Sequence, residues 1–127
     1  MIYKVTTDTP LEQVKNELAE HAKRSGFGVL GSYEFKKILE GKGFPIEKDI
    51  TVYELCSPSA AQEALAALPE VSVYLPCRIS LYEENGKTII ATINIFDVMN
   101  SINASEELHA HMNSVYKEFE LIMNSWN

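Results

Sequence analysis

The sequence is poor in cysteine, in long apolar runs and in export features, and each absence excludes a class of protein. Two cysteines among 127 residues are too few for a disulfide-rich scaffold. No apolar run approaches the roughly 20 residues of a membrane-spanning helix, and the N-terminal residues lack the apolar stretch of a signal peptide. We therefore expect a cytoplasmic protein whose cysteines are reduced thiols.

Positive charge is scarce in the second part of the chain. Lys and Arg number 11 against 18 Asp and Glu, which gives a net charge of −7. The only cations of residues 49–127 are Arg78, Lys87 and Lys117. A nucleic-acid backbone or an anionic membrane is bound by clustered Lys and Arg. We therefore expect neither nucleic acid nor membrane as a partner, and the acidity is typical of a solvated surface.

The common catalytic and metal-binding patterns are also missing. There is no ordered Ser, His and Asp set, no phosphate-binding loop and no dinucleotide-binding glycine pattern. His109 and His111 lie about 200° apart around a predicted helix and so do not share an ion, and His21 stands alone; all three are expected at the surface. Two thiols leave a zinc ion two ligands short. We expect no metal ion and no cofactor, and a non-catalytic protein is favoured over an enzyme.

The composition that remains is typical of a globular domain. Hydrophobic residues make up 46% of the chain and charged residues 23%, which excludes a disordered protein. The length matches one compact unit, so residues 1–127 are expected to form a single domain.

Periodicity and turn residues predict the order strand, helix, strand, strand, short helix, strand, strand, helix. Leu11, Val14, Leu18 and Ala22 form the apolar stripe of the first helix, which Thr9 caps and Gly26 ends. The first three strands are expected over residues 2–6, 27–35 and 50–56, with a bulge or close approach at Gly28 and Gly31. Residues 36–48 are expected to form a loop, with or without one helical turn.

Two further helices are expected. Residues 60–68 are alanine-rich, begin with a capping box of Ser59 and Gln62, and end at Pro69. The last helix is capped by Asn103 or Ser105. Its apolar stripe recurs at helical spacing: Leu108, Met112, Val115, Phe119, Ile122 and Trp126.

A β-hairpin is predicted between the two helices. Every odd residue from Val71 to Leu81 is apolar, which predicts one long strand over 71–82. Odd residues are also apolar from Ile89 to Ile95. Only a three-residue loop over 84–86 places both sets on one face, so we expect Leu81 opposite Ile89 and a positive φ at Gly86.

This layout predicts an α+β fold, a two-layer sandwich with helices packed on one face of a curved antiparallel sheet. Several segments, from Gly26-Phe27-Gly28 through Cys56-Ser57-Pro58 and Leu75-Pro76-Cys77-Arg78 to residues 82–87, together resemble the domain of unknown function 302 family over roughly residues 3–97. The resemblance implies a TATA-box-binding-protein-like sheet and a homodimer. It brings no established catalytic residues.

Cys56 and Cys77 are the candidate thiols. Cys56 ends a predicted strand just before the second helix, and the positive end of a helix favours a thiolate, so Cys56 is the candidate reactive group. The alternative is a buried, inert cysteine. Cys77 falls on the dry strand face and is expected to be unreactive, unless its strand lies beside Cys56 and makes it a resolving partner.

A second candidate site lies on the other face of the predicted hairpin. Tyr74, Arg78, Tyr82 and Phe96 share that face in the expected register. Arg78 could bind a small anionic ligand, stack on a ring or pair with a nearby acid. The face, which Ile90 also joins, is too apolar to stay open, so a second copy or another segment is expected to cover it.

Two hypotheses follow from the sequence. The first is a non-catalytic homodimeric binding module that holds a small ligand or a partner. The second is a thiol-based redox or sulfur-handling protein that acts through Cys56, with Cys77.

Overall fold

The computed structural model describes residues 1–127 and has eleven helices and strands in the order β-α-β-α-β-α-η-β-β-α-α. The strands are β1 (Ile2–Thr7), β2 (Gly28–Glu34), β3 (Thr51–Cys56), β4 (Cys77–Glu84) and β5 (Lys87–Ile93). The α-helices are α1 (Leu11–Arg24), α2 (Phe35–Gly41), α3 (Pro58–Ala67), α4 (Ile95–Asn100) and α5 (Glu106–Met123), and a 3₁₀ helix, η1, spans Pro69–Tyr74.

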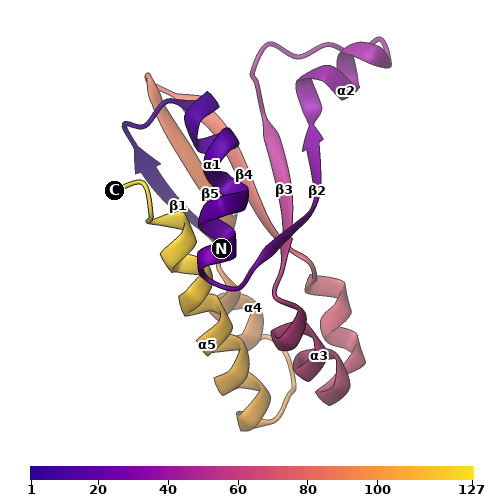
Figure 1. The fold of residues 1–127 in the computed structure, drawn as a ribbon. Helices are drawn as coiled ribbons and strands as arrows, with labels where there is room; N and C mark the ends of the chain where they lie inside the picture. Colours follow the sequence, from indigo (N-terminus) through magenta and orange to yellow (C-terminus); the bar gives the residue numbers. More distant parts are fainter.

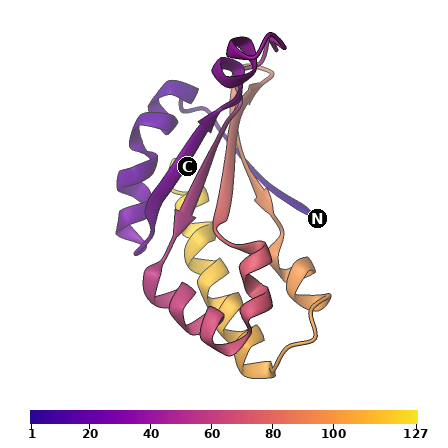
Figure 2. The same ribbon diagram turned by 90° about the vertical axis from the view of Figure 1, so that its right-hand side faces the viewer.

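The strands form one open antiparallel sheet in the order β1-β5-β4-β3-β2. Helices α1 and α5 cover one face of it, and α3, η1 and α4 gather beyond its lower end (Figures 1 and 2). The predicted α+β fold with helices on one face of an antiparallel sheet is confirmed. None of the helices is long and apolar enough to cross a membrane.

Two hydrophobic cores share helix α5. The larger core joins α1, α5 and the helix-facing residues of the sheet, and includes Phe119 and Ile122. The smaller core lies at the end of the sheet, where Met112 and Leu108 of α5 meet Ala64 and Val71. One continuous apolar stripe on α5 therefore connects the two cores.

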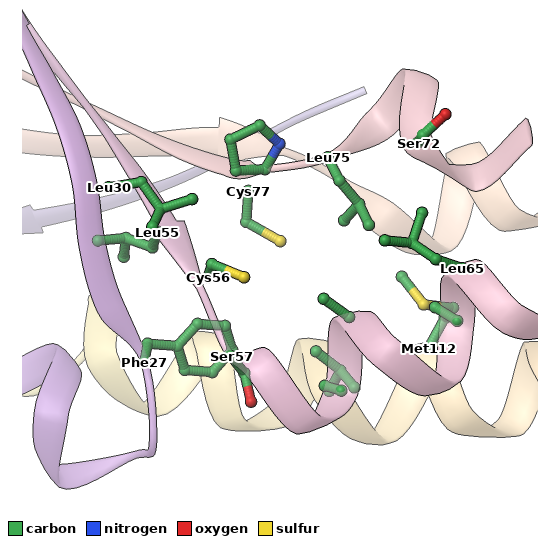
Figure 3. Close-up of a pocket in the computed structure, with 15 residues that line it drawn as sticks. Phe27, Leu30, Leu55, Cys56, Ser57, Leu65, Ser72, Leu75, Cys77 and Met112 are labelled. Atoms are coloured by element: carbon green, nitrogen blue, oxygen red, sulfur yellow. The ribbon is translucent and has the colours of Figure 1, made fainter. Parts of the chain in front are cut away.

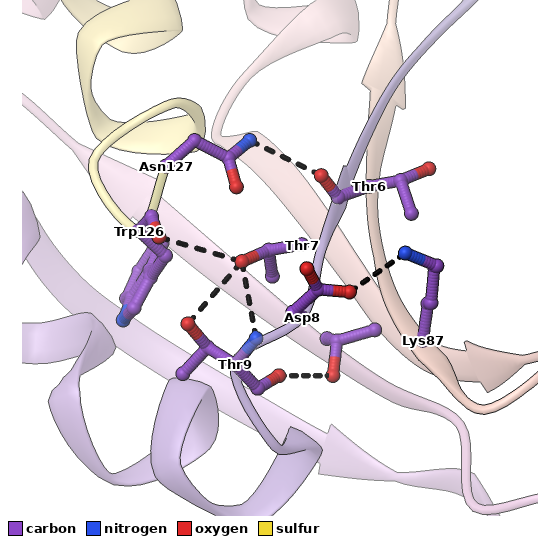
Figure 4. A network of polar contacts seen from close by, with 8 residues as sticks. Thr6, Thr7, Asp8, Thr9, Lys87, Trp126 and Asn127 are labelled. Atoms are coloured by element: carbon purple, nitrogen blue, oxygen red, sulfur yellow. Dashed lines mark hydrogen bonds and ion pairs between the residues drawn. The ribbon is translucent and has the colours of Figure 1, made fainter.

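The C-terminal residues fasten α5 to the first strand and helix. The Thr7 hydroxyl donates to the Trp126 carbonyl at 3.4 Å, and the Asn127 amide donates to the Thr6 carbonyl at 3.1 Å (Figure 4). The Trp126 ring stacks on His21 with centroids 4.1 Å apart. His21 is therefore a half-buried packing residue and not the free surface group expected from the sequence.

The predicted strand over 71–82 is wrong in its first half. Residues 69–74 form η1, in which Val71 is buried in the smaller core while Val73 is 79% exposed. Strand β4 begins only after Pro76, which lacks a backbone N–H for a strand ladder. The alternation of apolar residues before Cys77 reflects contacts of a helical turn and not a strand face.

The predicted hairpin register is also wrong. Leu81 lies opposite Ile90, because the turn has two residues, Asn85 and Gly86, both with positive φ. The predicted register assumed that the hairpin buries apolar residues on only one face of the sheet. In the structure Ile90 is buried beneath the helices, while Ile89 and Ala91 are 8% and 7% exposed on the other face, so β5 buries apolar residues on both faces and the assumption fails. The positive φ of Gly86 is confirmed.

The structure also differs from the prediction in several helix caps and in two short helices. Helix α1 begins at Leu11 and α3 at Pro58, and neither has a side-chain cap, so the predicted Thr9 cap and the predicted capping box of Ser59 and Gln62 are absent. Ser105 caps α5, as one of the two alternatives predicted. The predicted loop over 36–48 begins as helix α2, and Ile95 starts α4 behind an Asn94 cap instead of extending the strand. The bulge predicted in β2 lies between Val29 and Gly31.

We expect Gly86→Ala to lower the free energy of unfolding by about 1–2 kcal/mol. The φ of Gly86 is +75° and no atom lies within 4 Å of an added Cβ, so the cost is backbone strain alone. Urea unfolding measures it. Gly41→Ala is the matched control, because Gly41 also has open space and no positive φ. Equal stability of the two variants would contradict the observed turn.

Candidate functional site

An apolar cavity of about 260 Å³ lies where the two cores meet, at the lower end of the sheet. It is bounded by the ends of β3 and β4, by α3 and η1, and by α5 (Figure 3). Twelve of its 15 lining residues are hydrophobic. The lining residues are Phe27, Leu30, Leu55, Cys56, Ser57, Ala60, Ala61, Ala64, Leu65, Ser72, Leu75, Pro76, Cys77, Met112 and Val115.

The alanines of α3 explain why space remains here. Ala60, Ala61 and Ala64 face the cavity, where larger side chains would fill it. Protein interiors are otherwise close-packed, with few voids larger than a water molecule. Leu30 is the extra residue of the β2 bulge and stays 66% exposed at the cavity's edge. The bulge and the alanine-rich helix thus form one side of the opening.

The two thiols meet in this cavity. Leu55 is the strand partner of Cys77, and Cys56 follows it directly at the end of β3. Both cysteines are free and half-buried, and Figure 3 shows their sulfur atoms directed into the same space. A role for Cys77 as the resolving partner of Cys56 requires its strand to lie beside Cys56, and β4 does so.

Burial keeps Cys77 protonated at neutral pH. The Cys77 side chain is half-buried. Burial raises the pKa of the Cys77 thiol to about 11, and the neighbouring Cys56 adds to the shift. Desolvation disfavours the charged thiolate. Cys77 in its resting state is thus a neutral, weakly polar part of the cavity wall.

No charged side chain lines the cavity, and its polar groups are few. Besides the thiols they are the hydroxyls of Ser57 and Ser72. Helix α3 begins at this wall without a side-chain cap, and the Ala60 N–H has no acceptor within the chain. Unsatisfied N–H groups give a helix N-terminus a partial positive charge.

The four residues of the second candidate site, Tyr74, Arg78, Tyr82 and Phe96, do not share one face of the sheet as expected. Tyr74 belongs to η1, and Phe96 belongs to α4, where its ring packs 5.0 Å from that of Tyr116. Ile90 lies on the opposite, helix-covered face. The change of register and the unforeseen helices η1 and α4 separated this set.

Arg78 forms the ion pair that was one of its sequence-based alternatives. Its Nε lies 3.4 Å from Glu54 Oε2, and the Tyr33 hydroxyl donates to the other oxygen of Glu54 at 2.7 Å. That hydrogen bond raises the pKa of Tyr33. Tyr82 lies on the same strand with Lys48 5.7 Å from its ring centre. Arg78 is thus paired with Glu54 on the helix-free face of the sheet, while 60% of its side chain stays exposed.

Tyr74 and Arg78 do meet at a second, smaller cavity of about 90 Å³. It shares four residues with the larger cavity, which therefore lie between the two spaces: Pro76, Cys77, Met112 and Val115. Tyr82 and Phe96 do not line it. Of the three aromatic residues predicted to share a face with Arg78, only Tyr74 therefore lines this cavity with it.

The histidines hold helices together. His111 contacts Glu63 at 3.2 Å and the Ala60 carbonyl at 3.0 Å, which ties α5 to α3, and His109 contacts the Ile102 carbonyl at 3.3 Å. They are half-buried, not surface residues as expected. The chain has no cluster of three or more His, Cys, Asp or Glu side chains placed to hold a metal ion.

Sequence analysis missed most of the cavity wall. Phe27, Leu75 and Met112 were placed on predicted strands and on the apolar stripe of the last helix, with no role beyond packing. One pattern could have pointed to the cavity: an alanine-rich helix directly after Cys56 has too little side-chain volume to fill the core opposite Met112.

These features define the class of protein: a small α+β domain with an open antiparallel sheet, helices on one face and an apolar, thiol-lined cavity at the end of the sheet. The chain belongs to the family described as domain of unknown function DUF302, whose sequence pattern matches residues 3–126. The resemblance noted from the sequence is confirmed.

The fold has a close counterpart among solved structures. The crystal structure of an uncharacterized conserved DUF302 protein from Bacillus stearothermophilus matches with a TM-score of 0.91 at 25% sequence identity. The match covers 99% of this chain and 98% of that one. No curated protein matches the chain.

Proposed function

We propose that this domain is a non-catalytic binding module that holds a small, largely apolar molecule in the cavity between α3, α5 and the ends of β3 and β4. The supporting observation is the cavity itself, which is already open and is lined by 12 hydrophobic residues out of 15. Ligand sites are typically preformed, apolar and equipped with a few polar groups that fix orientation. Here those groups are the hydroxyls of Ser57 and Ser72 and the two thiols.

The volume limits the size of the ligand. A cavity of about 260 Å³ exceeds the roughly 150 Å³ that accommodates benzene and lies below the roughly 300–1,000 Å³ of drug-sized sites. A single aromatic ring with a short chain, or a compact fused bicycle, has the matching size. The absence of a charged lining residue favours a neutral ligand over the small anion that the sequence suggested.

Ala61→Phe is expected to weaken the binding of a neutral aromatic probe, indole, by at least about tenfold, because the added ring occupies the cavity. Titration followed by NMR chemical shifts measures the dissociation constant and locates the bound probe. The matched control is Ala66→Phe, the same substitution at an exposed position of the same helix outside the lining set.

Unchanged indole affinity in Ala61→Phe would contradict the proposal, and so would shift changes confined to residues away from Phe27, Leu55 and Met112. Native mass spectra of the protein purified from its own host would identify a bound compound directly. The homodimer expected from the sequence stays a proposal, and the same spectra report the number of subunits.

A second candidate function is thiol chemistry, which the convergence of Cys56 and Cys77 on one cavity favours. In this scheme the Cys56 thiolate attacks an external disulfide and releases one thiolate. Cys77 then loses its proton to solvent and attacks Cys56 of the mixed disulfide, which releases the second thiol. The two electrons pass to the external disulfide. Unequal reactivity of the two cysteines, treated in the Discussion, tests this scheme.

A further inference from the structure

We propose that Cys56 and Cys77 form a binding site for a thiophilic monovalent cation, Cu(I), in the wall of the apolar cavity. The two residues come from adjacent ends of β3 and β4, and both sulfur atoms face the same space (Figure 3). A third sulfur, that of Met112 on α5, lines the cavity from across it. The site uses the proposed ligand cavity but depends on the sulfurs and not on an apolar ligand.

The set of donor atoms selects the kind of metal. Thiolate and thioether sulfurs are soft ligands that favour Cu(I), whereas carboxylates and carbonyls suit Mg²⁺ and Ca²⁺. No Asp, Glu, His, Lys or Arg lines the cavity. A structural zinc site takes four protein ligands, of which this cavity supplies two thiolates. Cu(I) is stable with two or three sulfur ligands, which matches what the cavity offers.

Charge and protons balance in the binding step. Cu(I) replaces the protons of Cys56 and Cys77, two S–H bonds give way to two Cu–S bonds, and two protons pass to solvent. The resulting bis-thiolate complex carries one negative charge. The uncapped N-terminus of α3 lies at the same wall and contributes a partial positive charge, including the Ala60 N–H that has no acceptor. No electron transfer is involved, because copper enters and stays as Cu(I).

The apolar surroundings support the same assignment. The side chains of Phe27, Leu55 and Leu75 line the cavity together with the thiols and make their surroundings apolar. A hydrophobic shell of this kind controls which solvent and solute molecules reach a bound metal. The net charge of the protein, −7, favours the approach of a cation over that of an anion.

The test is an anaerobic titration of the full chain with Cu(I) in competition with a chromophoric Cu(I) chelator. We expect one Cu(I) per chain. Cys56→Ser and Cys77→Ser should each weaken binding by more than about 100-fold, and Met112→Leu should weaken it less. Met123→Leu is the matched control, because Met123 is fully buried and lies outside the cavity. Zn²⁺ should not displace the chelated Cu(I).

Affinity should also rise with pH. Metal binding releases protons from the ligand thiols, so the apparent Kd should fall as the pH rises from 6 to 9. X-ray absorption of the copper-loaded protein should show sulfur ligands only, which decides the question even if a cysteine variant does not fold.

Nitrogen or oxygen ligands in that spectrum, or unchanged Cu(I) affinity in both cysteine variants, would overturn the inference. Indole titration of the same variants separates this outcome from failure of the proposed function. Each serine substitution leaves the cavity open, so indole binding that persists without Cu(I) binding contradicts the metal site alone. Indole binding that is absent while Cu(I) binds contradicts the ligand proposal alone.

Discussion

Phe119→Ala is expected to lower the free energy of unfolding by about 3–5 kcal/mol, the largest stability effect that the structure predicts. Phe119 is 1% exposed and contacts Phe27 edge-to-face, with ring centres 5.6 Å apart. It lies on α5 within the larger core, so its truncation leaves a cavity between the helix layer and the sheet. Native domains have only about 5–15 kcal/mol of stability, so this variant should be close to unfolding at room temperature.

Urea denaturation followed by circular dichroism measures this effect. Leu121→Ala is the control on the same helix, because Leu121 is 60% exposed and should cost less than about 0.5 kcal/mol. A loss below about 1 kcal/mol for Phe119→Ala would contradict the packing of α5 on the sheet.

The second large expected effect is a slow reaction of the Cys77 thiol with disulfide reagents. In Cys56→Ser, Cys77 is the only thiol, and we expect it to react with an aromatic disulfide reagent about 20-fold or more slowly than free cysteine at pH 7.5. A pKa of about 11 against the usual value near 8.5 leaves about 300-fold less thiolate. The greater nucleophilicity of a more basic thiolate recovers only part of that loss. The rate should rise about tenfold per pH unit up to pH 10.

Cys77→Ser isolates Cys56 in the same assay. Cys56 directly precedes the N-terminal residues of α3 and should react faster than Cys77 across pH 5–9. If Cys56 reacts no faster than Cys77, the thiol chemistry offered as the second candidate function is contradicted. The apolar binding module does not depend on this result.

Periodicity predicted the elements whose burial is one-sided and local. Leu11, Val14, Leu18 and Ala22 of α1 are all buried, as their spacing predicted. Phe119 and Ile122 of α5 are buried for the same reason, because a stripe at helical spacing must face a core. Gly86 was correctly assigned a positive φ, since a tight hairpin turn requires one.

Prediction failed where residues far apart in the sequence share the burial. The hairpin register depends on whether β5 is covered on one face or both, and this is set by α1, α5 and β1 together. Val71 alternates like a strand residue but is buried by Met99 and Leu108, which follow it by more than 25 residues. The residues Tyr74, Arg78, Tyr82 and Phe96 do not share a face, because Tyr74 belongs to η1 and Phe96 to α4.

Composition and spacing within single segments were enough to predict the α+β class and the main helices, and several motifs taken together carried the family resemblance. The cavity could not be derived in this way, because it is the space left between α3, η1, α5 and two strand ends. An empty volume belongs to no segment. Only the tertiary structure places Cys56, Cys77 and Met112 around it, because their distance in space is set by how the two cores pack along α5.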